Sequence, residues 1–146
     1  MIDQWLTALL GKPEEIKGQG RCPPYLYRWR VWGGSVSRGY KSGRAIYIHH
    51  FVGNDWSLDL HDHPKRFISI GIKGSYREIT KTGDHWYRAP WIRWFPATHA
   101  HRIETPPAGC WTLAITLRAT REWGFWHDGQ WVHWHDYVSG KQSCAE

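Results

Sequence analysis

Two pairs of histidines stand out in the chain, because a single residue separates the members of each pair. His61 and His63 form the first pair, and His99 and His101 form the second. On a β-strand, residues i and i+2 point to the same face, so each pair would present two imidazoles side by side. Imidazole nitrogens are common ligands of divalent transition metals. The spacing therefore indicates a metal site. The alternative is that these histidines share a face by chance and serve in packing or at the surface.

The segment that carries both pairs resembles the two sequence motifs of the cupin superfamily. It runs from residue 55 to residue 105, and the positions that agree with the motifs are His61, His63, Gly74, Pro96 and His101. From about residue 25 onward, the chain also resembles small uncharacterised cupin-like proteins of phages and bacteria. The resemblance implies an all-β fold, a cupin-like antiparallel β-barrel of the jelly-roll type. It also implies a three-histidine metal site at His61, His63 and His101.

The chain departs from the cupin motifs at the acidic metal ligand. That slot holds Phe67, or Ile68 with the longer motif spacing, and Asp55 replaces a motif glycine. We therefore expect three neutral imidazoles, which do not offset the charge of the ion. They also leave some of its coordination positions open. Fe2+ is the expected divalent transition metal, with Zn2+, Ni2+ and Mn2+ as alternatives. Phe67 is expected to form a pocket wall, and His99 to be an additional ligand or a pocket residue.

Catalytic roles near this centre are expected for residues on two strands. His49 and His50 are adjacent in the β-rich run 45–52, so alternation sends one of them inward. We expect His49 to act as an acid or base, and His50 to be a further pocket residue or ligand, unless both are hydrogen-bonded barrel histidines. On a second strand, Tyr76 is expected to hydrogen-bond the substrate. Glu78 is expected to act as a base or to pair with an arginine. The alternative for both is a solvated strand face.

A short helix is predicted in front of the barrel. Apolar residues recur at helical spacing between Ile2 and Leu10, and Gly11 is suited to end the helix. We expect this helix over residues 1–11, the barrel over about 25–138, and a single domain over the whole chain.

The remainder of the chain consists of short β-rich runs between turn signals, which favours an antiparallel barrel or sandwich. The dipeptides Lys73-Gly74 and Asp128-Gly129 each predict a hairpin. The expected strands are 25–32, 44–52, 66–72, 75–81, 85–88, 91–95, 101–104, 110–118, 121–127 and 130–138.

The composition excludes several classes of protein. Among 146 residues there are 12 tryptophans, which build a core from rings, and no apolar run is long enough to span a membrane. Disorder and a coiled coil are therefore excluded. The three cysteines form no CxxC pair, and their odd number argues against a disulfide framework. With no recognisable signal peptide, we expect a cytoplasmic protein, in the host cytoplasm if a phage encodes it.

Two functional hypotheses follow from the residues and the resemblance. The first is a metal-dependent enzyme, an Fe(II)-type oxygenase or a related small-molecule enzyme, acting on a small anionic molecule at the three-histidine centre. Isomerase, lyase or zinc-hydrolase chemistry on the same three histidines is the alternative. The second is a non-catalytic binding module that captures an anionic ligand such as a nucleotide, a nucleic acid, or a protein partner. The net charge of +6 agrees with an anionic ligand in either case, and nucleic acid is the less favoured one. A homodimer and the absence of membrane contact are further expectations.

Overall fold

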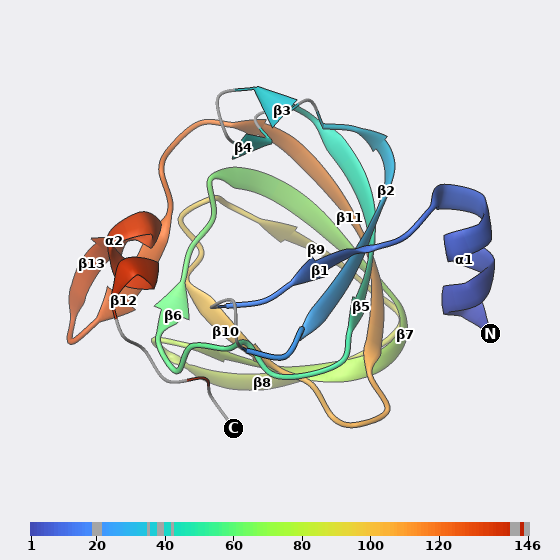
Figure 1. Cartoon of the computed structure of the whole chain (residues 1–146). Helices are drawn as coiled ribbons and strands as arrows, with labels where there is room; N and C mark the ends of the chain where they lie inside the picture. The colour runs from blue at the N-terminus through green and yellow to red at the C-terminus, as the bar shows by residue number, and fades with distance from the viewer. Residues whose placement is uncertain (19–21, 35, 38–39, 42, 141–143, 145–146) are drawn as a thin grey trace.

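The computed structural model describes residues 1–18, 22–34, 36–37, 40–41, 43–140 and 144 (Figure 1). Short strands dominate these residues, and a helix lies near each end of the chain. The elements are α1 (Ile2–Leu10), β1 (Glu14–Ile16), β2 (Leu26–Gly33), β3 (Val36–Ser37), β4 (Tyr40–Lys41), β5 (Ala45–Phe51), β6 (Leu60–His61), β7 (Lys65–Thr80), β8 (Gly83–Arg88), β9 (Trp91–Phe95), β10 (His101–Glu104), β11 (Cys110–Ala119), β12 (Gly124–His127), β13 (Gln130–His133) and α2 (Trp134–Ser139).

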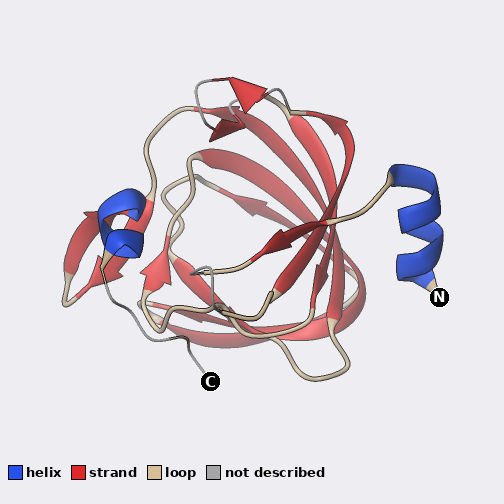
Figure 2. Ribbon diagram, viewed as in Figure 1, coloured by secondary structure: helices blue, strands red, loops and turns tan. Residues whose placement is uncertain are grey.

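The strands form one curled antiparallel sheet and a separate hairpin of β3 and β4. Neighbouring strands follow the order β1-β2-β5-β11-β7-β10-β6-β12-β13, while β8 and β9 also pair with β7. The sheet curves around an interior, with α1 outside it (Figure 2). The predicted all-β class, antiparallel barrel and short N-terminal helix are therefore confirmed.

β7 is one continuous strand, so the hairpin predicted at Lys73-Gly74 is wrong. Its first part pairs with β11 and β9, and its second part pairs with β10 and β8. Gly74 has a φ of +87°, and a Cβ atom at this position would lie 2.2 Å from the carbonyl oxygen of Gly109. Glycine here permits a bend and a close approach to the neighbouring strand, not a reversal of the chain.

The hairpin predicted at Asp128-Gly129 is confirmed, and it joins β12 to β13. Both turn residues have positive φ, 49° and 75°, as a tight two-residue turn requires. The strand expected over 130–138 is too long, because α2 begins at Trp134. In that helix, Tyr137 stacks on Phe125 with ring centroids 4.0 Å apart, and both rings belong to a buried cluster with Trp56.

Helix α1 packs on the outside of the sheet through a small part of its apolar surface. Leu6 is its only buried residue, and it packs against Trp29 of β2 and Trp111 of β11. Trp5 and Leu9 stay exposed. Gly11, with a φ of +83°, follows the last helical residue, as expected. Neither α1 nor α2 has the length and apolar character that crossing a bilayer requires.

A disulfide joins the two ends of the chain, which corrects the expectation of no disulfide framework. Cys22 and Cys144 form the bond across a sequence separation of 122 residues, and Cys110 is the buried free cysteine. The fold brings the segment before β2 next to the tail after α2, and spacing along the chain carries no signal of that proximity.

The two faces of the sheet are identified by the position of α1. Ile48 contributes to the cluster under α1, so it points outward, and its neighbour His49 points inward. Register then places Thr112, opposite His49, on the inner face as well. The inner face is where the predicted site residues meet.

Candidate metal centre

Three histidines from three segments converge at one end of the inner face. His61 ends β6, His101 begins β10, and the two are register partners. His63 lies just before β7, and its backbone N–H donates to the carbonyl of Ala97 at 3.0 Å. The three ring centroids lie 5.0 to 5.1 Å from one another. The structure therefore brings together the three residues predicted as metal ligands.

The ring nitrogens of this cluster are spaced for a single ion. One nitrogen from each ring of His61, His63 and His101 lies within 4.8 Å of the other two. The Nε2 atoms of His63 and His101 are 2.9 Å apart. Two ligands at right angles, each about 2.0–2.1 Å from an ion, would be separated by about 2.9 Å. The donor set and this separation fit a divalent transition metal, and the right angle is typical of six-coordinate ions.

A buried carboxylate fixes the orientation of His101. Its Nδ1–H donates to Oε1 of Glu78 at 2.7 Å, which leaves Nε2 as the atom facing the other two histidines. Glu78 is 1% exposed, and its other oxygen accepts a hydrogen bond from Arg93 at 2.6 Å. Burial alone would raise the pKa of Glu78, but hydrogen bonds from His101, His99 and Arg93 hold that pKa well below its usual value. Glu78 is thus an ionised acceptor, as in other carboxylate–histidine pairs behind a metal.

A second buried carboxylate lies behind His61. Oδ2 of Asp55 is 3.6 Å from Nδ1 of His61 and accepts the backbone N–H of Ile103 at 2.8 Å. Burial raises the pKa of Asp55 to about 7. Two of the three imidazoles therefore have a carboxyl group on the side away from the cluster.

The three imidazoles are held in their neutral form. Burial, followed by the proximity of the other histidines, lowers the pKa of His61 to about 3 and that of His63 well below its usual value. The pKa of His101 is also lowered by burial, against the opposing effect of Glu78. A neutral imidazole has the free lone pair that a metal requires, so the cluster is preorganised for coordination.

Phe67 and His99 lie at the edge of the cluster. The ring of Phe67 is 4.9 Å from that of His63 and stacks on Phe95 at 4.6 Å, which agrees with the predicted apolar wall. The Nε2–H group of His99 donates to Oε1 of Glu78 at 2.9 Å, and the ring centroid of His99 is 5.1 Å from that of His101. His99, Glu78 and His101 form a second group of closely spaced ligand atoms. Arg93 already pairs with the negative charge of Glu78. We therefore assign Glu78 and His99 to orienting His101.

The other predicted residues are not brought to the three-histidine cluster. His49 lies inward between Tyr47 and Phe51, and its Nε2 is buried without a hydrogen-bond partner among the described residues. His50 lies on the outer face, where it stacks on Trp111 at 4.0 Å, so its assignment to the pocket is wrong. The cause is α1, whose Asp3 lies 3.2 Å from the imidazole of His50.

Tyr76 is inward and buried, but Arg93 engages it. The guanidinium donates to the Tyr76 hydroxyl at 3.0 Å and lies over the rings of Tyr87 and Phe95. Burial raises the pKa of Tyr76, so the hydroxyl stays protonated. Tyr76 and Glu78 together hold Arg93 in place, which matches the predicted Glu–Arg pair.

Sequence reasoning did not single out Asp55 as an orienting residue, and it missed Arg93. The signal for Asp55 was present, because an acidic residue replaces a glycine of the cupin motif there. The signal for Arg93 was its place between Trp91 and Phe95 at alternate positions of one strand, where a charge among rings needs a partner.

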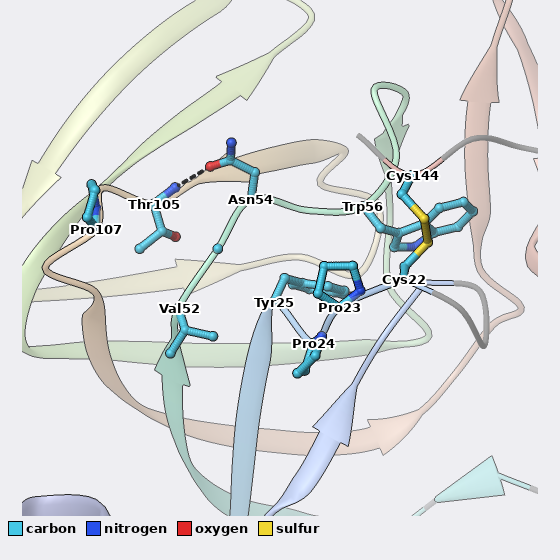
Figure 3. A pocket seen from close by; sticks show the side chains of 11 residues that line it. Cys22, Pro23, Pro24, Tyr25, Val52, Asn54, Trp56, Thr105, Pro107 and Cys144 are labelled. Atoms are coloured by element: carbon cyan, nitrogen blue, oxygen red, sulfur yellow. Dashed lines mark hydrogen bonds between the residues drawn. A yellow bond between two sulfur atoms is a disulfide. The ribbon is translucent and has the colours of Figure 1, made fainter. Parts of the chain in front are cut away.

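A separate pocket lies near the disulfide, away from the histidines (Figure 3). It has a volume of about 380 Å³, and its wall includes the disulfide, Pro23, Tyr25 and Trp56. The backbone N–H of Thr105 donates to Oδ1 of Asn54 at 2.9 Å beside it. The described residues that line this pocket include no histidine or carboxylate.

Solved structures with a similar fold belong to cupin proteins. A sugar phosphate isomerase of the cupin superfamily from Silicibacter pomeroyi is similar with a TM-score of 0.53 and 16% identity, covering 71% of this chain and 66% of that one. The DMSP lyase DddQ from Ruegeria pomeroyi has a TM-score of 0.55 and 13% identity, covering 76% of this chain and 58% of that one. A cupin-like protein from Thermotoga maritima has a TM-score of 0.51 and 12% identity, covering 74% and 76%.

No protein-family profile and no curated protein matches the sequence. The chain spans less than two thirds of the length of the isomerase and lyase chains. At these identities the similarity concerns the fold, and the likeness to small phage and bacterial proteins stays a prediction. The chain has the fold of the cupin superfamily, and its cluster of three histidines suggests a divalent metal.

Proposed function

We propose that the chain is a metal-dependent enzyme that holds one divalent ion on His61, His63 and His101. The observation that carries the proposal is the 2.9 Å separation of the His63 and His101 Nε2 atoms, with Glu78 fixing the tautomer of His101. The same 2.9 Å separation also permits a hydrogen bond between the two rings, so the metal content of the protein decides between the two arrangements. A bound ion would supply Lewis acidity and, if it is Fe2+, reactivity toward dioxygen.

The residues around the histidines would orient the ligands and exclude water. Glu78 and Asp55 limit rotation of two imidazoles, and Arg93 keeps Glu78 ionised and in place. Phe67 and Phe95 form a stacked apolar wall next to His63. Such a wall strengthens the interaction between the ion and a charged ligand, because it lowers the local dielectric constant.

An Fe(II) oxygenase is the reaction class that this arrangement favours. Isomerases and lyases need a protein base to take a proton, and two described carboxylates lie close to the cluster. Glu78 is occupied by Arg93, His99 and His101, and Asp55 lies behind His61, where it accepts the backbone N–H of Ile103. Tyr76 is held protonated by burial. An oxygenase needs no such base when its substrate binds as an anion beside dioxygen. The similar solved structures named as an isomerase and a lyase keep those reactions as the alternatives.

The substrate class proposed for this site is a small anion. Three neutral ligands leave the charge of the ion uncompensated, and the chain itself carries a net charge of +6. A carboxylate oxygen, a thiolate sulfur or a phosphate oxygen would therefore bind the ion directly. The binding-module hypothesis uses the same site and predicts that the anion leaves unchanged.

Oxygen uptake by the iron-loaded protein tests the proposed reaction. The protein is loaded with Fe2+ without oxygen and then mixed with oxygen and a panel of small carboxylates, thiols and phosphates. Consumption of oxygen together with one compound, abolished by His101→Ala and unchanged in His85→Ala, supports an oxygenase. His85 is a suitable control because it is exposed on β8. Conversion without oxygen uptake indicates an isomerase or lyase, and binding without conversion supports the binding module.

A further inference from the structure

The side chain of Asp62 lies between two candidate metal ligands in the sequence and points away from them. His61 and His63 face the cluster, whereas the carboxylate of Asp62 is buried, with the residue 2% exposed. Its Oδ1 atom accepts the backbone N–H of Gly124 at 2.8 Å, and its Oδ2 atom accepts the indole N–H of Trp131 at 2.9 Å. A buried carboxylate with both oxygens bonded fixes the backbone that carries it, because rotation of the residue would break these hydrogen bonds.

Arg121 connects Asp62 to the backbone of two ligand-bearing segments. Its Nη1 atom lies 2.9 Å from Oδ2 of Asp62 and donates to the carbonyl oxygens of His63 at 3.3 Å and of Ala97 at 3.4 Å. The backbone N–H of His63 donates to the same Ala97 carbonyl at 3.0 Å. Ala97 belongs to the turn between β9 and β10, and His101 begins β10. One guanidinium therefore ties the segment of His63 to the turn that leads into His101.

The strand pairing around these ligands is short. β6 has two residues and lies between β10 and β12 (Figure 1). It forms one register pair with β10, between His61 and His101, and two register pairs with β12. His63 lies after β6 and before β7, so no strand pairing of the described residues includes it. The position of His63 therefore depends on the contacts of its backbone with Ala97 and Arg121.

The narrow tolerance of a metal site makes such backbone contacts important. Each ligand atom must lie within about 0.2 Å of its ideal distance from the ion. The Nε2 atoms of His63 and His101 are 2.9 Å apart, although the two residues are 38 positions apart in the sequence. A side chain that ties the two segments together therefore affects whether both nitrogens reach one ion.

We infer that Asp62 and Arg121 are positioning residues of the proposed metal centre. They hold the backbone of His61 and His63 against the turn before His101, so that all three imidazoles reach one ion. This pair acts on the backbone of the ligand segments, whereas Glu78 acts on the ring of His101. The inference rests on the proposed function, because it requires that the histidines bind an ion.

Cobalt binding by the folded chain tests this inference. Co2+ binds the same nitrogen ligands as other divalent transition metals, and its visible absorption depends on the number and arrangement of its ligands. Competition with a chelator measures the affinity, and circular dichroism shows whether each variant is folded. A purely structural role of Arg121 would lower the free energy of unfolding of the metal-free chain, but it would leave the cobalt affinity and spectrum of the folded chain unchanged.

Arg121→Gln removes the charge of the guanidinium and keeps one hydrogen-bond donor group. We expect at least ~10-fold weaker binding of Co2+ and a changed visible spectrum, because loss of a residue that orients ligands has an effect of this size. Arg121→Lys keeps the charge without the planar fork, so it should bind Co2+ more tightly than Arg121→Gln does.

Arg28→Gln is the matched control. Like Arg121, Arg28 pairs with a carboxylate, with its Nη2 atom 2.8 Å from Oε2 of Glu14, and lies over an aromatic ring. The exposed fraction of its side chain is 24%, against 31% for Arg121. Arg28 belongs to β2, outside the ligand segments, so this variant should keep the cobalt affinity and spectrum of the unmodified chain.

The outcomes separate this inference from the proposed function. An unmodified chain that binds no Co2+ would contradict the metal centre and, with it, this inference. If the unmodified chain binds Co2+, an unchanged affinity and spectrum in folded Arg121→Gln would overturn the inference alone, and so would equal losses of affinity in Arg121→Gln and Arg28→Gln.

A milder variant decides the question if Arg121→Gln does not fold. Trp131→Phe removes the N–H that bonds to Asp62 and keeps an aromatic ring at that position. The loss of one hydrogen bond to a carboxylate should weaken Co2+ binding ~3-fold. Weaker binding of this size would support the positioning role, and unchanged binding would overturn it.

Discussion

Strands β5, β7, β9 and β11 each have two faces, and the side chains on these faces differ in kind. Facing inward, polar side chains such as Thr112 and Arg93 lie among buried apolar ones, which include Tyr47, Phe95 and Ala114. Facing outward, the neighbouring positions hold isoleucine, leucine and tryptophan. Polar groups inside a barrel cost free energy unless they are paired, and apolar groups outside it stay in water. The comparison therefore separates an inner face, where the loss of a partner such as Arg93 leaves a buried charge, from an outer face, where a substitution leaves the buried interior unchanged.

The largest expected effect compares two consecutive residues on opposite faces. Arg93→Met removes the cation from Glu78, a carboxylate that is 1% exposed, and should lower the free energy of unfolding by about 3–5 kcal/mol. Ile92→Thr, on the outer face, should change the stability of the monomer by at most about 1 kcal/mol. Urea unfolding at a dilution that keeps the chain monomeric measures both. Equal losses of unfolding free energy in the two variants would mean that the ion pair between Arg93 and Glu78 does not stabilise the fold more than an outer side chain does.

The disulfide provides a change that should affect neither face. Cys22→Ser opens the link to Cys144 across 122 residues and should cost about 2–4 kcal/mol of unfolding free energy. Metal content should stay the same. Thiol titration of the denatured, unreduced protein should find the single free thiol of Cys110. Three thiols per chain would show that the bond is absent.

The inner face should also make stability depend on pH through His49. Burial, aided by Arg28, lowers the pKa of His49 to about 3, whereas the unfolded value is 6.5. Between these values the unfolded chain binds the proton and the folded chain does not, so stability falls as pH decreases below 6.5. The contribution of His49 is about 1.4 kcal/mol per pH unit. Between pH 7 and pH 5, the free energy of unfolding of metal-free protein should therefore depend less steeply on pH in His49→Gln than in the unmodified chain. An unchanged dependence would mean that His49 is exposed to solvent in the folded protein.

The smallest expected effect concerns the wall of the metal site. Phe67→Glu adds a carboxylate next to His63, whose ring is 4.9 Å from that of Phe67. Metal should bind as well or up to ~10-fold better, because the carboxylate offsets the charge of the ion, while activity falls. Competition with a chelator measures the affinity. Affinity and activity that both stay unchanged would mean that the side chain at position 67 points away from the ion.

The sequence predicted the parts of the molecule that depend on spacing along the chain. The i, i+2 spacing of His61 and His63 and the turn at Asp128-Gly129 are local, and both lead to the observed geometry. Alternation put Tyr76 and Glu78 on one face of their strand but left open whether that face is inward, which the structure decides. Alternation also did not predict that His50 points outward. It separates the two faces of a strand, and only the packing of α1 decides which of them is inside.

The features that sequence reasoning missed depend on contacts between distant segments. Gly74 has the composition of a turn, but its close approach to Gly109 makes it a bend within β7. The Cys22–Cys144 bond and the contact between Asp55 and His61 also require the closed barrel. Each of these is an interaction that a single sequence does not encode in its local pattern.

The metal content of the purified protein tests the three-histidine centre most directly. After dialysis, elemental analysis of the unmodified chain should find close to one divalent transition metal ion per chain. His101→Ala should lose most of it, because this residue contributes an Nε2 atom 2.9 Å from that of His63, while the exposed His85→Ala control should retain it. Full occupancy in His101→Ala, or equal losses in both variants, would contradict a metal centre built from His61, His63 and His101.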